Sequence, residues 1–311
     1  MKPLLILAIL MATSASTHAQ QQKVSYSTFQ LSDTVYMLVG RGGNVGISAG
    51  DDGLFIIDDQ LAPITAQLLE AIRKISNQPI RFVINTHFHF DHTGGNEAIG
   101  GAGTVIIAHD NIRKRMTSEQ VNLFLPRTTP PHPQAALPMV TFNDRMSLHL
   151  NGETATAYYV ANGHTDGDSI IHFPLSNVIH MGDMYFNGMY PYVDLEAGGA
   201  IQGVIQAADL ALSLADDETR IIPGHGPLAI TEDLRNYRDF LVDAVENVQV
   251  LIDQGKDLQQ TIDAQPTAEW DEELGKVWIT PAQFVTFIYN SLEGIHEYTP
   301  PVVTNDGDDA Q

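Results

Sequence analysis

A cluster of histidines and one aspartate directly follows an apolar segment, residues 81–85. The next residues read Thr-His-Phe-His-Phe-Asp-His, and the side chains with metal-binding chemistry are His87, His89, Asp91 and His92. Imidazole nitrogens and carboxylate oxygens both bind Zn²⁺, at about 2.0–2.2 Å. In an extended chain successive side chains alternate between two sides, so His87, His89 and Asp91 point to the same side. A turn after them then brings His92 close to these three. A metal site is therefore favoured over a chance histidine-rich loop.

Three further polar positions lie where other apolar segments end. His164 stands in the sequence Asn-Gly-His-Thr, Asp183 follows Gly182, and His225 lies in Pro-Gly-His-Gly-Pro. Taken alone, each is better explained as a structural turn residue. Together with the first cluster they provide five histidines and two aspartates, which are enough donors for two metal ions.

Donors so far apart in the sequence can meet only if the strands that precede them end at the same place. The hydrophobic pattern predicts many short strands with few helices between them. Strands are expected over residues 34–39, 44–48, 54–57, 81–85, 104–108, 146–150, 154–160, 169–173, 178–181 and 220–222. Helices are expected over residues 63–75, 201–214, 234–248 and 281–292. Residues 124–138 carry five prolines and are expected to form a loop.

This order of elements predicts an α/β sandwich followed by a helical extension. The sandwich domain is expected over residues 20–230. A helical C-terminal extension with an acidic tail is expected over residues 231–311.

The composition excludes several functions. Lys and Arg number 16 against 38 Asp and Glu, which gives a formal net charge of -22. Nucleic acid is not expected as a partner, because phosphate binding needs clustered basic side chains. The absence of cysteine excludes disulfides, thiol nucleophiles and thiolate metal ligands. The expected partner is a small-molecule substrate, and no pattern in the sequence specifies an oligomeric state.

The first residues have the pattern of a signal peptide. Lys2 precedes an apolar run from Leu4 to Met11, and Thr17-His18-Ala19 offers a cleavage site with small residues at both ends. The apolar run is shorter than the roughly 20 residues that span a bilayer, so no membrane anchor is expected. The sequence thus predicts residues 1–19 as a signal peptide, with export to the periplasm or secretion.

The histidine-rich motif and the later His, Asp and His occur in the order found in the metallo-β-lactamase superfamily, which residues 35–227 resemble. The resemblance implies an αββα sandwich (the metallo-β-lactamase fold) with two zinc ions per chain at one edge of its sheets. It divides the donors into two sets and a bridge: His87, His89 and His164 for one zinc, Asp91, His92 and His225 for the other, and Asp183 between both. It also implies that Asp58 orients one of these ligands. A turn residue before the first helix is the alternative for Asp58.

The implied ligands suggest a mechanism. Two zinc ions about 3.5–4 Å apart share a water and lower its pKa toward roughly 7. The expected reaction is attack of the resulting metal-bound hydroxide on a carbonyl of a small lactone, ester or β-lactam ring. Asp91 is the candidate catalytic residue, which would orient the hydroxide or carry its proton.

Aromatic and amide side chains that follow Asp183 are candidates for substrate binding. Tyr185 and Asn187 are the two we assign to this role, with Phe186, Tyr190 and Tyr192 as further members of a substrate wall. The alternative is an ordinary aromatic cluster beneath the C-terminal helices. Aromatic walls favour a neutral, partly apolar substrate, and the net charge slows the approach of anions.

Related activities remain as alternatives. The missing cysteine excludes the β-lactamases with a thiolate ligand, whereas a subclass that uses only histidine and aspartate leaves a β-lactamase proper open. A mononuclear iron enzyme similar to persulfide dioxygenases is an alternative from another class. A binding or scaffold protein with a vestigial site is disfavoured, because the donor set is complete.

Overall fold

The computed structural model describes residues 23–301. The first set of strands comprises β1 (Ser27–Gln30), β2 (Val35–Val39), β3 (Val45–Gly50), β4 (Gly53–Ile57), β5 (Ile80–Ile84), β6 (Val105–His109) and β9 (Val140–Phe142). The second comprises β10 (Arg145–Leu150), β11 (Glu153–Tyr159), β12 (Ser169–Phe173), β13 (Val178–Phe186), β14 (Arg220–His225) and β15 (Ala229–Ile230). A separate hairpin consists of β7 (Gln120–Asn122) and β8 (Arg127–Thr129).

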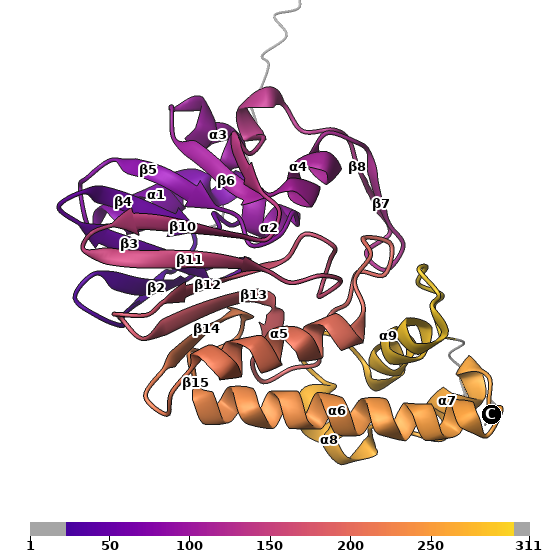
Figure 1. Ribbon diagram of the computed structural model, residues 1–311. Helices are drawn as coiled ribbons and strands as arrows, with labels where there is room; N and C mark the ends of the chain where they lie inside the picture. The colour runs from indigo at the N-terminus through magenta and orange to yellow at the C-terminus, as the bar shows by residue number, and fades with distance from the viewer. Residues whose placement is uncertain (1–22, 302–311) are drawn as a thin grey trace, which may run out of the picture.

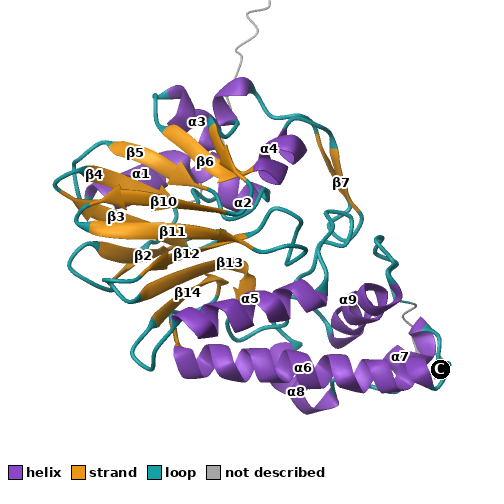
Figure 2. Ribbon diagram, viewed as in Figure 1, coloured by secondary structure: helices purple, strands orange, loops and turns teal. Residues whose placement is uncertain are grey.

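The helices divide between an N-terminal and a C-terminal group. The first group is α1 (Thr65–Arg73), α2 (Phe90–Thr93), α3 (Asn96–Gly101) and α4 (Asp110–Met116). The second group is α5 (Ile201–Leu214), α6 (Thr231–Asp253), α7 (Leu258–Asp263), α8 (Ala268–Leu274) and α9 (Pro281–Glu293). Figure 2 shows that the strands form the centre of the molecule and that the helices lie outside them.

The two sheets pack face to face (Figure 1). The seven-stranded sheet has the order β1-β2-β3-β4-β5-β6-β9, and the six-stranded sheet has the order β10-β11-β12-β13-β14-β15. Helices lie on the outer face of each sheet, so the layers run helix, sheet, sheet, helix. The predicted α/β class and αββα architecture are confirmed.

Strand β4 illustrates why both faces of the first sheet are buried. Its side chains alternate, so that Leu54 packs with Leu68 of α1 while Phe55 points toward the second sheet. There Phe55 stacks on Phe173 of β12, with ring centroids 5.8 Å apart. Apolar residues at consecutive positions therefore fill two different layers of the core.

The C-terminal helices form the outer layer of the second sheet. Helix α6 buries Leu234, Leu241 and Val248, which recur every seven residues and form one face of the helix. These side chains share an apolar cluster with α5, α9 and the second sheet. Helix α6 begins at Thr231, where the sequence predicts the start of the helical extension.

The structure departs from the prediction mainly in its short strands and helices. Residues 124–138 contain the strand β8 and a 3₁₀ turn at Gln134–Ala136 rather than only a loop. The helices α3, α4, α7 and α8 were not predicted, because six or seven residues show too little of a 3.6-residue period. The predicted strand 178–181 continues as β13 to Phe186, past a bulge at Gly182.

The predicted signal peptide, residues 1–19, and the acidic tail from Asn305 lie outside the described residues. Within residues 23–301, none of the helices combines the length and the apolar character that crossing a bilayer would require.

Candidate metal centre

The seven predicted donors come together where strands of the two sheets end. His87 follows β5, and His164 lies in the connection between β11 and β12. Asp183 belongs to β13, and His225 is the last residue of the neighbouring parallel strand β14. Donors far apart in the sequence therefore meet at one edge of the sandwich.

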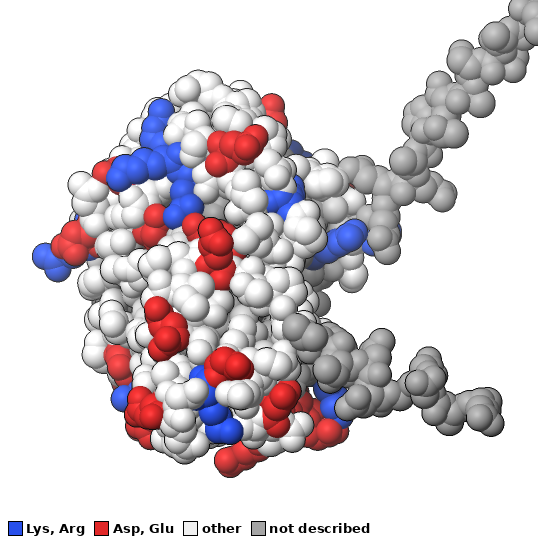
Figure 3. Space-filling view, turned by 90° about the vertical axis from the view of Figure 1, so that its right-hand side faces the viewer, with Lys and Arg blue, Asp and Glu red and all other residues white. Residues whose placement is uncertain are grey.

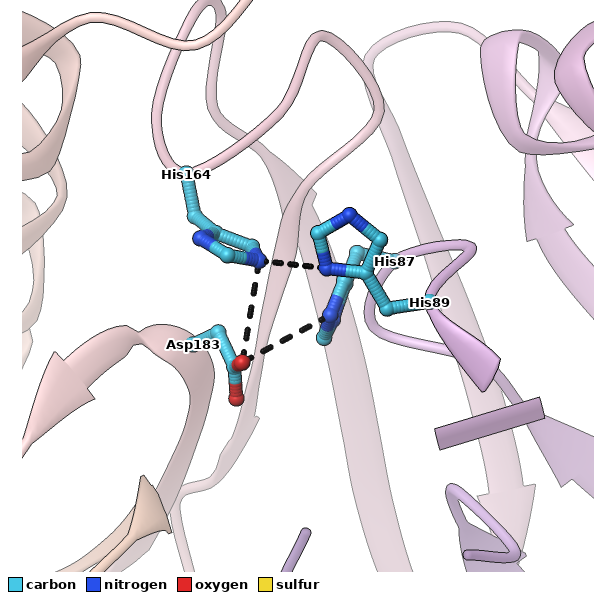
Figure 4. Close-up of side chains that lie close together, drawn as sticks. All are labelled: His87, His89, His164 and Asp183. Carbon is cyan, nitrogen blue, oxygen red and sulfur yellow. Dashed lines mark hydrogen bonds and ion pairs between the residues drawn. The ribbon is translucent and has the colours of Figure 1, made fainter. Parts of the chain in front are cut away.

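One group of donors consists of His87, His89, His164 and Asp183, all directed toward a common point in Figure 4. The His164 Nε2 atom lies 2.8 Å from His89 Nδ1. The Asp183 Oδ2 atom lies 3.7 Å from His87 Nε2 and 3.6 Å from His164 Nε2. One donor atom from each residue lies within 4.8 Å of those of the others.

The second group consists of Asp91, His92 and His225. The Asp91 Oδ2 atom lies 3.3 Å from His225 Nε2 and 3.7 Å from His92 Nε2. Asp183 also contacts this group, because its Oδ1 lies 3.0 Å from His92 Nε2 and its Oδ2 lies 3.4 Å from His225 Nε2. Asp183 thus stands between the two groups.

One expectation about the histidine-rich motif is wrong. The chain is not extended from His87 through Asp91, because α2 begins at Phe90 with His89 as its N-cap. The helical turn places Asp91 and His92 in the second group, although the His92 ring centroid still lies 4.2 Å from that of His87. The two pairs of donors therefore separate at residue 90, and His87, His89 and Asp91 do not share one face.

Close backbone packing brings Asp183 to its position. Gly182 adopts a positive φ of 54°, and a Cβ there would lie 2.7 Å from Thr86. A Cβ on Gly224 would lie 2.0 Å from Asp183 Oδ1. Glycine at these two positions leaves the space that the carboxylate occupies.

Asp58 is hydrogen-bonded to one of the donors and to a residue next to another, and the family resemblance implies that it orients a donor. Its carboxylate accepts hydrogen bonds from the Thr86 backbone N–H at 2.8 Å and from Thr86 Oγ1 at 2.7 Å. Its Oδ2 also lies 2.8 Å from His92 Nδ1. Thr86 Oγ1 lies 3.0 Å from His87 Nδ1, so Asp58 reaches one histidine of each group.

Two further supports were missed by the sequence analysis. The Asp194 Oδ2 atom lies 2.8 Å from His89 Nε2, and the Tyr192 carbonyl lies 2.8 Å from His164 Nδ1. These contacts fix the ring orientations and leave the second nitrogen of each ring for the donor cluster. Asp194 follows β13 without a motif or a regular spacing, so no local signal marks it in the sequence.

Burial and mutual charge shift the pKa values in opposite directions within the cluster. Burial lowers the pKa of His87 well below its usual range, and His92 lowers it further. Burial also opposes the charge of His225, but the Asp183 and Asp91 carboxylates outweigh it and raise the pKa of His225 to about 9. Burial likewise disfavours ionised Asp183, yet the adjacent His92 and His225 hold its pKa well below the usual value.

The donors fit a divalent cation. The His87 Nε2 atom is buried and finds no hydrogen-bond partner among the described residues, although it points into the cluster. A buried polar atom without a partner costs roughly 1–3 kcal/mol, and coordination of a cation would remove that cost. Each group combines imidazole nitrogen with carboxylate oxygen, the donor types that zinc prefers where thiolates are absent.

A cavity of about 390 Å³ lies next to the donors. His89, Asp91, Asp183 and His225 line it on one side. Its other walls are mostly apolar and consist of Phe90, Leu125, Met189, Tyr192, Gly226 and Trp278. Trp278 comes from the connection between α8 and α9, so the C-terminal helical region contributes to the cavity.

Tyr185 and Asn187 do not line this cavity, contrary to the predicted substrate wall. The Tyr185 ring is buried against Tyr237 of α6, with ring centroids 4.7 Å apart. The Asn187 side chain donates a hydrogen bond to the Pro227 carbonyl. The bulge at Gly182 changes the alternation along β13, and of the predicted aromatic residues Tyr192 is the one that reaches the cavity.

The sandwich and the histidine-rich donor cluster at its edge are features of metal-dependent hydrolases. A family model of the metallo-β-lactamase superfamily matches residues 38–225, which is more than half of the chain. The protein therefore belongs to the metallo-β-lactamase superfamily.

The curated relatives are distant. The chain is 20% identical over 259 residues to a metallo-β-lactamase type 2 of Bacteroides fragilis, with 79% of this chain and 98% of the relative covered. It is 22% identical over 328 aligned positions to the alkyl/aryl-sulfatase BDS1 of Saccharomyces cerevisiae, with 90% and 51% covered. It is also 24% identical over 141 residues to the 2,4-dinitroanisole O-demethylase subunit alpha of Nocardioides sp., with 45% and 40% covered.

Solved structures show the same fold. The sec-alkylsulfatase Pisa1 from Pseudomonas sp. has a TM-score of 0.66 at 19% identity, and the match covers 85% of this chain and 50% of that one. A metallo-β-lactamase from Pontibacter korlensis has a TM-score of 0.56 at 18% identity, with 70% and 100% covered. The chain thus spans about half the length of the sulfatases that it resembles.

Metal binding is expected to release protons. In the metal-free protein His225, with a pKa raised to about 9, carries a proton at pH 7.5, and coordination must displace it. Calorimetric titration of metal-free protein with zinc at pH 7.5, in buffers of different ionisation enthalpy, should show release of at least about one proton per chain. The release should diminish as the pH rises through about 9, where His225 has already lost its proton. Heats that do not depend on the buffer at pH 7.5 would contradict this charge assignment.

Proposed function

We propose that the protein is an exported hydrolase that uses two zinc ions to cleave the C–O or C–N bond next to a carbonyl in a small, partly apolar substrate. A lactone, an ester or a β-lactam ring fits this description. The observation that carries the proposal is the pair of donor groups joined by Asp183 at the edge of a cavity with apolar walls. Bound zinc would supply Lewis acidity, which polarises a carbonyl oxygen and makes water more acidic.

Asp91 is the residue that we assign to positioning the attacking water. Burial disfavours its charge, but His92 and His225 outweigh this effect and lower its pKa to about 2. The carboxylate is therefore ionised at neutral pH and accepts hydrogen bonds. Because it lines the cavity beside His225, it can hold a water molecule in a fixed direction toward the substrate.

The composition of the cavity walls favours a substrate whose reacting group carries no charge. Phe90, Leu125 and Trp278 present apolar surface, and neither lysine nor arginine is among the residues that line this cavity. Burial of an apolar substrate body against these side chains would exclude bulk water from the reacting carbonyl.

Sulfate-ester hydrolysis is a second candidate function. The likeness to the Pisa1 alkylsulfatase covers 85% of this chain, against 70% for the metallo-β-lactamase of Pontibacter korlensis. The sulfatase likeness thus extends further along the chain. An alkyl sulfate also combines an apolar body with a leaving group that zinc could stabilise.

The metal content should respond to single donor substitutions. Wild-type protein purified without chelators is expected to hold about two zinc ions per chain. His89→Ala and Asp183→Ala should lose metal, and their turnover should fall by at least about 100-fold, because each removes a donor from the cluster. Elemental analysis and circular dichroism would separate loss of metal from loss of fold.

His149→Ala, at an exposed position on β10, is the matched control and should keep both metal and turnover. A wild-type protein that holds one iron and consumes oxygen would instead support the persulfide dioxygenase alternative.

A substrate panel tests the reaction class. Zinc-loaded protein should hydrolyse aryl esters and lactones with a higher kcat/KM than alkyl sulfates, because the cavity favours an uncharged reacting group. β-Lactams belong in the same panel, since they carry the same type of carbonyl. A preference for secondary alkyl sulfates over every carbonyl substrate would overturn the proposal in favour of the second candidate.

Export is the remaining part of the proposal. It rests on Lys2, the apolar run from Leu4 to Met11 and the small residues before Gln20. When the chain is expressed in a bacterium with two membranes, the periplasmic fraction should contain a protein that begins at Gln20. N-terminal sequencing identifies that residue, and an uncleaved protein found solely in the cytoplasm would refute export.

A further inference from the structure

The β7–β8 hairpin is attached to the metal centre through Asn122. The Asn122 Nδ2 atom donates hydrogen bonds to Tyr192 Oη at 2.6 Å and to Asp194 Oδ2 at 3.1 Å. The same Asp194 oxygen lies 2.8 Å from His89 Nε2. One strand of the hairpin is therefore fixed to a residue that orients a predicted metal ligand.

Arg127 is the residue opposite Asn122 on the other strand of the hairpin. Its guanidinium carbon lies 4.1 Å from the centroid of the Phe90 ring, which is the geometry of a cation–π interaction. Phe90 stands between His89 and Asp91 in the sequence. The hairpin register and the Phe90 ring together hold the Arg127 charge beside the metal centre.

The charge of Arg127 is not neutralised within the described part of the chain. None of the ion pairs there involves Arg127, and its cation–π contact is with an uncharged ring. Basic side chains gather in the upper half of the face in Figure 3, at the height of α4, β7 and β8 in Figure 1.

Arg127 lines a second cavity of about 450 Å³ that adjoins the first. Phe90 lines both cavities and so forms part of the wall between them. Arg41, from the turn between β2 and β3, also lines the second cavity, and Glu97 is the one acidic residue in its lining. A molecule that extends from the metal centre past Phe90 would thus meet the guanidinium group of Arg127.

We propose that Arg127 forms a subsite for a carboxylate group of the substrate, remote from the bond that is cleaved. This inference rests on the proposed function and narrows it to esters or lactones that carry an anionic group on the acyl side. A guanidinium binds a carboxylate through two parallel hydrogen bonds, which fixes direction as well as charge. The reacting carbonyl would lie in the first cavity and the carboxylate in the second.

Two esters with the same leaving group test the proposal: neutral 4-nitrophenyl butyrate and the anionic mono-4-nitrophenyl ester of glutaric acid. The ratio of kcat/KM for the anionic ester to that for the neutral ester should fall about tenfold in Arg127→Gln, through an increased KM for the anionic ester. Arg127→Lys should retain only part of the ratio, because it keeps the charge but cannot form the two parallel hydrogen bonds. Arg145→Gln, at an exposed position on β10, is the control and should leave the ratio unchanged.

Binding of glutarate to the zinc-loaded protein gives a readout that does not need turnover. Calorimetry should show affinity for glutarate at least about fivefold weaker in Arg127→Gln than in the wild type, with no such loss for butyrate. Equal loss for both acids, or equal glutarate affinity in the two proteins, would overturn the subsite. If neither ester is hydrolysed by the wild type, the proposed function fails, and the glutarate measurement alone decides the subsite.

Discussion

Both halves of the metal centre depend on one buried carboxylate, Asp183. Its two oxygens lie 3.0–3.7 Å from four imidazole nitrogens that come from three different segments of the chain. Imidazoles packed so closely repel one another once protonated, and burial deprives them of solvation. The structure resolves this conflict by leaving His87 and His164 with lowered pKa values, while His92 and His225 have raised ones. In the absence of a metal, the protons on His92 and His225 thus balance the negative charge of Asp91 and Asp183, which a bound cation would otherwise balance.

The fold supplies the rigidity that this cluster needs. Asp58, Asp194 and the Tyr192 carbonyl each hold the outer nitrogen of a histidine ring, so the inner nitrogens are fixed in direction. These supports come from residues that follow strands of both sheets. Because the apolar core between the sheets sets the positions of those strands, packing far from the cavity determines the geometry of the donors.

The sequence predicts the architecture and the four donors of the histidine-rich motif from local patterns, whereas His164, Asp183 and His225 stand out only in combination with that motif. Strand periodicity and a His-x-His-x-Asp-His motif are visible within a few residues. What was missed depends on contacts between distant segments: Asp194 lies 105 positions beyond His89, and α2 redirects Asp91 within a single turn. Tyr185 was wrongly predicted to line the cavity for a related reason, since the bulge at Gly182 changes which side chains of β13 face the donors, whereas Tyr192 does line it.

The cavity combines two kinds of segment. Its floor comes from strand ends that supply metal donors, whereas Leu125 and Trp278 belong to connections that supply none. Mutations in those connections can reshape the walls while the metal chemistry remains intact. A new substrate range would therefore need few compensating changes in the core, because in this chain the residues of the β7–β8 and α8–α9 connections shape the cavity walls without holding the metal.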